Sequence, residues 1–286
     1  MTAQDNGDVL TERHGATLLV RLNRPQRHNA IGGTMLRDLA EAFDRARSDD
    51  GVRVVVLTGT GKSFCVGADV ADFDQVAGVA ARDMLAGELI GGAKGVAELS
   101  PDERVVDEFG NAGRWVQRIW SLDKPVIAAV NGAAVGGGFA LTLLADLRVA
   151  GGSARFGTGF AAVGIAPEMG ASLLLPTIVG AATAAELLFT SRMLTAEQAR
   201  DIGLVSSVFD DDDLTDGALE LAARIAANPP LGVRFAKRLL RRATAADLVG
   251  QLQAEHRAQS VLFDHPATHE AMNAVAGRVQ RRREQP

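Results

Sequence analysis

Three consecutive glycines, Gly136, Gly137 and Gly138, stand between a short apolar segment and a second apolar segment of helical character. The first segment, residues 126–130, is a continuous run of valine, isoleucine and alanine, which predicts a buried strand. Asn131-Gly132 then signals a turn. After the glycines, residues 139–144 predict a buried helix. The stretch therefore predicts a strand-to-helix junction at which backbone N–H groups are accessible.

Such a junction is suited to binding negative charge. The first N–H groups of a helix have no acceptor within the helix, and the helix dipole favours an anion there. Because glycine lets a ligand approach the backbone closely, the site could hold a phosphate or an oxyanion that develops during a reaction. A tight turn that needs a positive φ is the alternative interpretation. Neither G-x-G-x-x-G nor G-x-x-x-x-G-K-[ST] occurs in the chain, which disfavours a nucleotide loop that binds phosphate.

A second buried strand leads into another glycine loop. Residues 54–58 are Val-Val-Val-Leu-Thr, and residues 62–70 are Lys-Ser-Phe-Cys-Val-Gly-Ala-Asp-Val. Together with Lys124-Pro125 before the first strand and the glycine triplet, these segments resemble the crotonase superfamily, also called the enoyl-CoA hydratase/isomerase family. The resemblance covers residues 18–208 and, more weakly, the rest of the chain.

The resemblance implies a fold of the α/β class. We expect a crotonase-like ββα spiral core over residues 9–205, followed by a C-terminal helical region, residues 206–286, that helps trimerisation and covers the CoA site. A homotrimer or a dimer of trimers is implied in the same way. The strand and helix order that recurs along the chain agrees with a layered α/β core.

Composition and charge exclude several classes of protein. The 286 residues suffice for one large domain or two small ones, and a net charge of -5 argues against nucleic-acid binding. No run of about eighteen apolar residues predicts a membrane span, and no leader segment opens the chain, so we expect a cytoplasmic protein. The single cysteine, Cys65, excludes an intrachain disulfide and is expected to be a small buried residue. The five histidines show no metal-ligand spacing.

Periodicity predicts the main elements outside these motifs. Residues 34–47 and 101–120 are expected to be helices because their apolar residues recur at helical spacing, whereas the polar residues 1–8 are expected to be frayed. Thr195 and Gln198 have the spacing of a capping box. From residue 214 onward only helices are expected, and one of them carries a basic face that is either solvated or in contact with CoA phosphates: Arg234, Lys237, Arg238, Arg241 and Arg242.

The resemblance also implies the site residues. The backbone N–H groups of Ala68 and Gly137 would form an oxyanion hole for a thioester carbonyl that becomes an enolate. Residues around these two loops are expected to bind the substrate: Val66, Gly67, Asp69, Val70, Gly136, Gly138, Ala140 and Phe160. Residues expected near the CoA moiety are Gln26, Arg27, His28 and Arg278; a solvated loop residue is the alternative for His28. CoA is part of the substrate, and no separate cofactor or metal is expected.

The proton-transfer groups depart from those of the hydratases. The resemblance places the two hydratase glutamates at Ala140 and Phe160, and neither of these side chains can transfer a proton. One carboxylate remains nearby, Glu168, at a position where some isomerase branches of the family carry their catalytic Asp or Glu. A double-bond shift needs only one base, and an apolar pocket would raise its pKa toward a useful value. The alternative role for Glu168 is a carboxylate that stabilises a helix N-terminus.

Three functions follow from these residues. The first is a single-carboxylate enoyl-CoA isomerase, the second is a 2-enoyl-CoA hydratase of the fatty acid β-oxidation type, and the third is a non-catalytic protein that binds acyl-CoA. Loss of both glutamates favours the first and third functions. Retention of both oxyanion segments favours an enzyme. We expect the isomerase.

Overall fold

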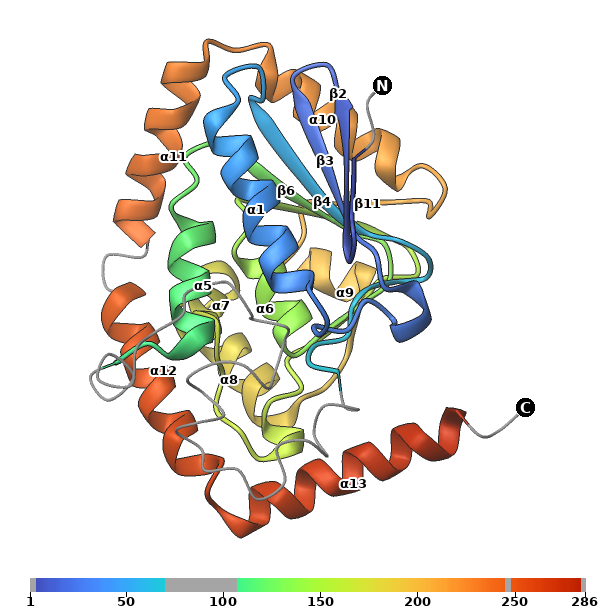
Figure 1. The fold of residues 1–286 in the computed structure, drawn as a ribbon, viewed down its shortest axis with the longest axis vertical. Coiled ribbons are helices and arrows are strands. Elements are labelled where there is room, and N and C mark those ends of the chain that lie inside the picture. Colours follow the sequence, from blue (N-terminus) through green and yellow to red (C-terminus); the bar gives the residue numbers. More distant parts are fainter. Residues whose placement is uncertain (1–3, 70–106, 245–247, 284–286) are drawn as a thin grey trace.

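Two β-sheets and the helices around them form the protein (Figure 1). The computed structural model describes residues 4–69, 107–244 and 248–283. Within these residues one sheet has seven strands, in the order β1-β2-β3-β4-β6-β8-β11, and the other has four, in the order β10-β9-β7-β5. The structure confirms the expected α/β spiral fold.

The large sheet is mixed. Strands β1 and β2 are antiparallel to their neighbours, and β3, β4, β6, β8 and β11 run parallel to one another. Its strands are β1 (Gln4–Asn6), β2 (Val9–His14), β3 (Thr17–Leu22), β4 (Val54–Gly59), β6 (Val126–Val130), β8 (Leu147–Gly151) and β11 (Ser207–Phe209). The strands of the small sheet are β5 (Ser63–Cys65), β7 (Ala133–Val135), β9 (Arg155–Gly157) and β10 (Leu194–Thr195).

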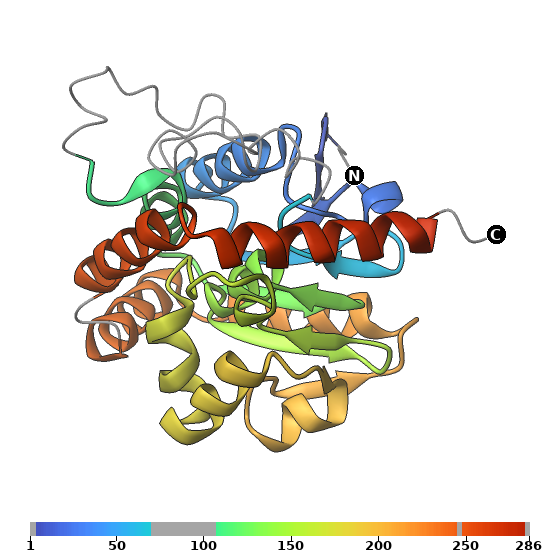
Figure 2. The ribbon, with the colours of Figure 1, turned by 90° about the horizontal axis from the view of Figure 1, so that it is seen from below.

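The chain passes repeatedly from the large sheet to the small one, which gives the spiral. Strand β4 is followed by β5, β6 by β7, and β8 by β9. Figure 2 shows strands of the small sheet side by side near the middle of the view. Because β5, β7 and β9 are parallel neighbours, the loops that follow them lie at one edge of the small sheet.

Ten helices surround the sheets in the described part of the chain. They are α1 (Met35–Ser48), α5 (Gly110–Trp120), α6 (Gly137–Leu143), α7 (Ala171–Val179), α8 (Ala181–Thr190), α9 (Ala196–Asp201), α10 (Leu214–Ala226), α11 (Pro230–Thr244), α12 (Leu248–Leu262) and α13 (Pro266–Arg283). Two short 3-10 helices, η1 (Pro25–Arg27) and η3 (Ala161–Val163), lie in loops. The expected capping box at Thr195 is present: its side chain accepts from the Gln198 N–H.

Burial on both faces explains why the parallel strands are continuously apolar. All six residues of β4 and all five of β6 are buried. Val56 and Ile127 face a cluster that includes Leu214 and Ala218 of α10, whereas Val55 packs in the larger cluster with the residues of α1. Parallel strands covered by helices on both sides lack the alternation of half-exposed strands, so the expectation of buried strands is confirmed.

The boundaries differ from expectation in three places. Residues 4–6 are not frayed but pair with β2. Of the helix expected over 101–120, α5 covers residues 110–120, and residues 107–109 are not helical; residues 70–106 lie outside the described part. Strand β11 lies beyond residue 205 and pairs with β8, so the large sheet extends past the boundary expected between core and helical region. The division into two units stays a prediction.

The basic face of α11 is partly buried and partly exposed: Lys237 and Arg241 are enclosed, whereas Arg238 and Arg242 are exposed. Its side chains form ion pairs with Asp123 and Asp146 of the core, which fasten the helix to the sheet region. The pairs are Arg234–Asp123 (2.6 Å), Arg238–Asp123 (2.6 Å), Lys237–Asp146 (2.7 Å) and Arg241–Asp146 (3.2 Å). Arg242 is exposed. No helix in the described ranges is long and apolar enough to cross a membrane.

Candidate active site

The two glycine-containing loops predicted from the sequence meet in the structure. A Cβ placed on Gly67 would lie 3.3 Å from the Gly137 nitrogen and 3.6 Å from the Gly136 Cα. Gly67 is held from the other side by Ile31, whose N–H donates to the Gly67 carbonyl at 2.7 Å. The strand-to-loop segments after β5 and β7 therefore come together in space, as their parallel pairing requires.

The three glycines of the triplet differ in what a side chain at each position would do. Gly136 has φ 56° and ψ −124°, a conformation that side chains of L-residues rarely adopt. At Gly138, a Cβ would lie 2.0 Å from the Cys65 backbone oxygen, so only glycine allows α6 to approach β5 this closely. At Gly137, a Cβ would meet the Ile31 Cδ1 at 2.9 Å and the Met169 sulfur at 3.5 Å. Substitution at Gly137 would therefore crowd side chains and leave backbone contacts unchanged.

Two backbone N–H groups remain available at this junction. The N–H of Asp69 and the carbonyl of Gly67 bond to Ile31, so the N–H of Ala68 between them points away from Ile31. Gly137 is the first residue of α6, and its N–H has no acceptor in the helix. Neither N–H donates to an acceptor among the described residues. Both groups can bind an oxygen that gains negative charge.

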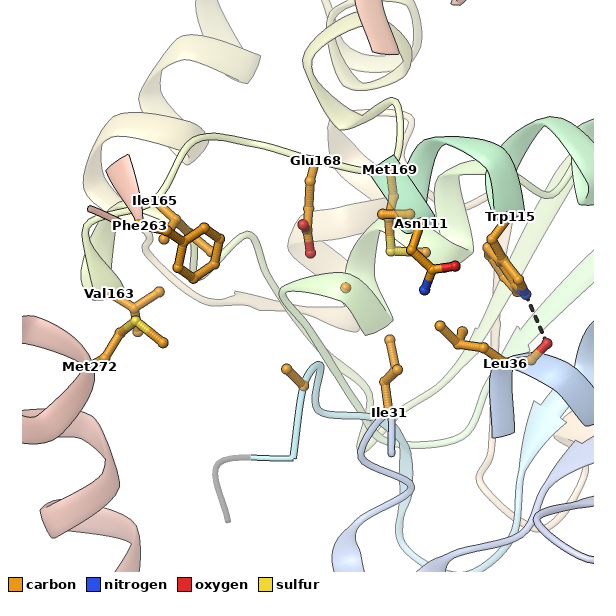
Figure 3. A pocket seen from close by; sticks show the side chains of 13 residues that line it. Ile31, Leu36, Asn111, Trp115, Val163, Ile165, Glu168, Met169, Phe263 and Met272 are labelled. Carbon is orange, nitrogen blue, oxygen red and sulfur yellow. Dashed lines mark hydrogen bonds between the residues drawn. The ribbon is translucent and has the colours of Figure 1, made fainter. Parts of the chain in front are cut away.

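A cavity lies beside these N–H groups and is lined mainly by apolar side chains. Its volume is about 110 Å³, measured as the space open to the centre of a water molecule. Ala68, Gly137 and Glu168 all line it, and Figure 3 shows Glu168 among the lining side chains. The other lining residues are Ile31, Leu36, Asn111, Ala112, Trp115, Val163, Ile165, Met169, Phe263 and Met272. The three residues expected to do chemistry are therefore brought to one cavity.

Glu168 lies in the loop before α7, and its side chain points into the cavity (Figure 3). The pKa of Glu168 is raised to about 7, chiefly by burial and also by the nearby Glu255 carboxylate, against a hydrogen bond from Gln259 that lowers it. A carboxylate with a pKa near neutrality can both take up and release a proton at physiological pH. A pKa of this kind is what a general base needs, and the role of Glu168 as the base stays a prediction.

The alternative role expected for Glu168 belongs to another residue. Glu255 of α12 accepts hydrogen bonds at the N-terminus of α7, from the Gly170 N–H at 2.8 Å and from the Ser172 N–H at 3.0 Å. Glu255 is therefore the carboxylate that stabilises this helix end, and Glu168 is left facing the cavity.

Ala140 and Phe160 do not line this cavity. Ala140 is fully buried on α6 and Phe160 is 2% exposed before η3, and both belong to the main hydrophobic core. Their substrate-binding role stays a prediction. No other ionisable side chain from the described residues lines the cavity with Glu168.

The residues expected near CoA do not line the cavity. Gln26 and His28 are exposed and Arg27 is partly buried, at η1; Arg278 is exposed on α13. Asp69 is buried and forms ion pairs with Arg24 at 3.2 Å and with Arg27 at 3.9 Å, which ties this loop to the oxyanion segment. Val66 is partly buried, Gly67 is buried, and Val70 lies outside the described residues.

Several lining residues were not predicted from the sequence. Asn111 and Trp115 come from α5, and the Trp115 Nε1 donates to the Leu36 carbonyl at 2.8 Å. Phe263 and Met272 come from the end of α12 and from α13. An apolar stripe in the sequence indicates burial but does not indicate which partner the stripe meets. The apolar stripe of the helix expected at 101–120 was the one available signal.

Cys65 is a structural residue, as expected. It is fully buried in β5, and burial raises the pKa of its thiol to about 12. A thiol with that pKa is not a nucleophile at neutral pH. Within the described ranges, no group of three or more His, Cys, Asp or Glu side chains could hold a metal ion.

Comparison with known proteins identifies similar sequences over most of the chain. The family described as enoyl-CoA hydratase/isomerase matches residues 12–85 and 102–284. A short-chain-enoyl-CoA hydratase of Clostridium acetobutylicum is 32% identical, over 93% of this chain and 94% of that protein. A 1,2-epoxyphenylacetyl-CoA isomerase of Escherichia coli is 34% identical, over 86% of this chain and 87% of that protein.

Comparison of structures agrees with that of sequences. The crystal structure of an enoyl-CoA hydratase/isomerase from Pseudoalteromonas atlantica superimposes with a TM-score of 0.79 and 29% identity. The superposition covers 95% of this chain and 98% of the Pseudoalteromonas atlantica chain. The similar proteins carry both hydratase and isomerase names.

Proposed function

Because the chain belongs to the enoyl-CoA hydratase/isomerase family, we propose that it is an enoyl-CoA isomerase that shifts a carbon–carbon double bond with a single carboxylate. The observation that carries the proposal is the position of Glu168. Its carboxylate lines the same cavity as Ala68 and Gly137 and has a pKa raised to about 7. The similarity to a named isomerase of Escherichia coli supports it.

In the proposed reaction, the thioester oxygen of a 3-enoyl-CoA lies between the N–H groups of Ala68 and Gly137. Glu168 removes a proton from C2, and the electron pair of the C–H bond delocalises onto the oxygen as a dienolate. The protonated Glu168 then returns a proton to C4 while the thioester carbonyl re-forms. The C3–C4 double bond is lost, a C2–C3 double bond is formed, and no water enters.

The oxyanion donors and the general base would each lower the activation free energy of this reaction. One hydrogen-bond donor in an oxyanion hole contributes about 2.7–4 kcal/mol to transition-state stabilisation. A positioned general base contributes about 10²–10⁴-fold in rate. The apolar lining of the cavity strengthens both effects because it lowers the local dielectric constant.

A 2-enoyl-CoA hydratase is the second candidate, because the similar protein of Clostridium acetobutylicum is named as one. Hydration needs one group to activate water and another to deliver a proton. The residues at the two positions inferred for the hydratase glutamates are Ala140 and Phe160, and both are buried away from the cavity. This observation favours the isomerase.

Product analysis distinguishes the two reactions. The purified protein is incubated with 3-enoyl-CoA and, separately, with 2-enoyl-CoA of matched chain lengths. If the protein is an isomerase, 3-enoyl-CoA is converted to 2-enoyl-CoA without a change of mass, and 2-enoyl-CoA is hardly hydrated. Rapid formation of 3-hydroxyacyl-CoA, with no isomerisation, would instead assign the hydratase. Binding of both compounds without any turnover would assign the non-catalytic function.

We also propose that the protein is a homotrimer or a dimer of trimers, and that Gln26, Arg27, His28 and Arg278 lie near bound CoA. Helix α11 exposes Leu231, Phe235 and Leu239, which are four residues apart and lie on one side of the helix. Such an apolar face is typical of a surface that another subunit covers. Sedimentation that detects only monomer at micromolar concentration would contradict the assembly.

A further inference from the structure

Helix α12 carries three polar side chains at a spacing of four residues: Gln251, Glu255 and Gln259. This spacing places them on one side of the helix, and all three contact the segment that carries Glu168. Gln251 donates to the Ser172 hydroxyl at 2.6 Å. Gln259 donates to the Ala166 carbonyl at 3.1 Å and to the Glu168 carboxylate at 3.4 Å. The polar side of α12 thus holds this segment on both sides of Glu168.

Glu255 is the central residue of the three. It is 6% exposed, and its carboxylate accepts from the Gly170 N–H, the Ser172 N–H and the Ser172 hydroxyl. Glu255 and Glu168 also line one small cavity of about 30 Å³, next to the larger one. Two carboxylates therefore lie beside the same small cavity, Glu255 buried and Glu168 partly buried.

The two carboxylates have unequal environments. Burial raises the pKa of both, but Glu255 has three donors that stabilise its charged form. Glu168 has one long hydrogen bond, and the charge of Glu255 opposes its ionisation. Because hydrogen-bond donors favour a charged carboxylate and a like charge disfavours it, Glu255 ionises first and Glu168 keeps its proton to higher pH.

We propose that Glu255 is a positioning residue for the proposed base: its ionised carboxylate fixes the loop that carries Glu168, and its charge sets how readily Glu168 accepts and returns a proton. This inference rests on the proposed isomerase function for its catalytic meaning. The arrangement follows a general pattern in which paired carboxylates take different roles because their environments differ.

One further titratable group lies beside the same small cavity. His256 of α12 lines it, and burial lowers the pKa of that imidazole. Asp107 and Arg114, which form an ion pair at the start of α5, act on His256 in opposite directions. His256 is therefore neutral at and above neutral pH, and Glu255 is the charged neighbour that acts on Glu168.

The test is a pH titration of Glu168 in the protein without substrate. The titration is monitored through the carbon-13 NMR chemical shift of the Glu168 carboxyl group. The signal is assigned by its loss in Glu168→Gln. In the wild type, Glu168 is expected to titrate near pH 7 and to respond also at the lower pH where Glu255 ionises. In Glu255→Gln, the midpoint is expected to move to lower pH. The rate of double-bond shift at pH 6, relative to that at pH 8, should rise by about threefold or more.

The matched control is Ser172→Ala, which removes one hydrogen bond to Glu255 and keeps both carboxylates. A purely structural role for Glu255 predicts that both variants lose thermal stability and that neither moves the Glu168 midpoint to lower pH. That result would overturn the proposal. If Glu255→Gln does not fold, an ordinary midpoint for Glu168 in the wild type, near pH 4.5, overturns it equally. Because the NMR titration uses no substrate, failure of the isomerase function is seen separately, as absence of turnover with an unaltered titration.

Discussion

The two halves of the candidate site are built in different ways. One half consists of backbone: the loops at Gly67 and at the glycine triplet present N–H groups that buried parallel strands hold in place. The other half consists of side chains: Glu168 faces the cavity from a loop that Glu255, 85 residues from Gly170 in sequence, fastens to α12.

This difference predicts different sensitivities. The backbone half contains no group that titrates, and its geometry depends on the absence of side chains at the glycines. The side-chain half depends on the charges of Glu168 and Glu255 and on helix α12, which follows much later in the chain. Substitution should therefore affect the backbone half through folding or through loss of a donor, whereas pH should affect only the side-chain half.

The largest effect is expected from Gly138→Ala. The new Cβ would lie 2.0 Å from the Cys65 carbonyl oxygen, and a backbone atom cannot move aside as the end of a side chain can. We expect destabilisation of about 3 kcal/mol or more, at the upper end for an overpacked core, measured by chemical unfolding. A wild-type unfolding midpoint would show that α6 and β5 are not in contact in this way.

Gly137→Pro is expected to remove a donor and leave the fold intact. Proline is tolerated at the first position of a helix, and the φ of Gly137 is not positive. We expect kcat to fall about 10²–10³-fold, the range for loss of one oxyanion donor. Gly137→Ala is the matched control, since it adds a Cβ near Ile31 but keeps the N–H. Equal activities of the two variants would argue against an oxyanion role for this N–H.

The same difference decides what could be predicted from sequence. The backbone half could be predicted, because a buried strand, a glycine turn and a helix are adjacent in the chain, as at residues 126–144. The partners of Glu168 could not, because Glu255 and Gln259 lie in α12, after five intervening helices, α7 to α11, and helical spacing does not indicate which surface a polar side meets. The polar strand β2 was not predicted for a related reason: its alternation is weak, and pairing with β1 and β3 stabilises it.

The smallest effect is expected in the pH dependence of stability. Folding raises the pKa of Glu168 from its ordinary value of 4.5 to about 7, so the folded protein keeps a proton that the unfolded chain releases. The contribution of Glu168 to the free energy of unfolding should therefore fall as pH rises from about 4.5 to 7. Glu168→Gln lacks this loss, and its stability relative to the wild type should increase by about 1–3 kcal/mol between pH 5 and pH 8. A difference that does not change with pH would mean that Glu168 is ordinarily solvated.

The central claim is that Glu168 is the single base of this site, and the rate of conversion of 3-enoyl-CoA to 2-enoyl-CoA by Glu168→Gln tests it most directly. The amide keeps the size of the side chain and cannot accept the proton, so the rate should fall about 10²-fold or more with CoA-thioester binding retained. Glu220→Gln, at an exposed glutamate of α10, is the control and should keep the wild-type rate. A Glu168→Gln variant that isomerises as fast as the wild type would contradict the account.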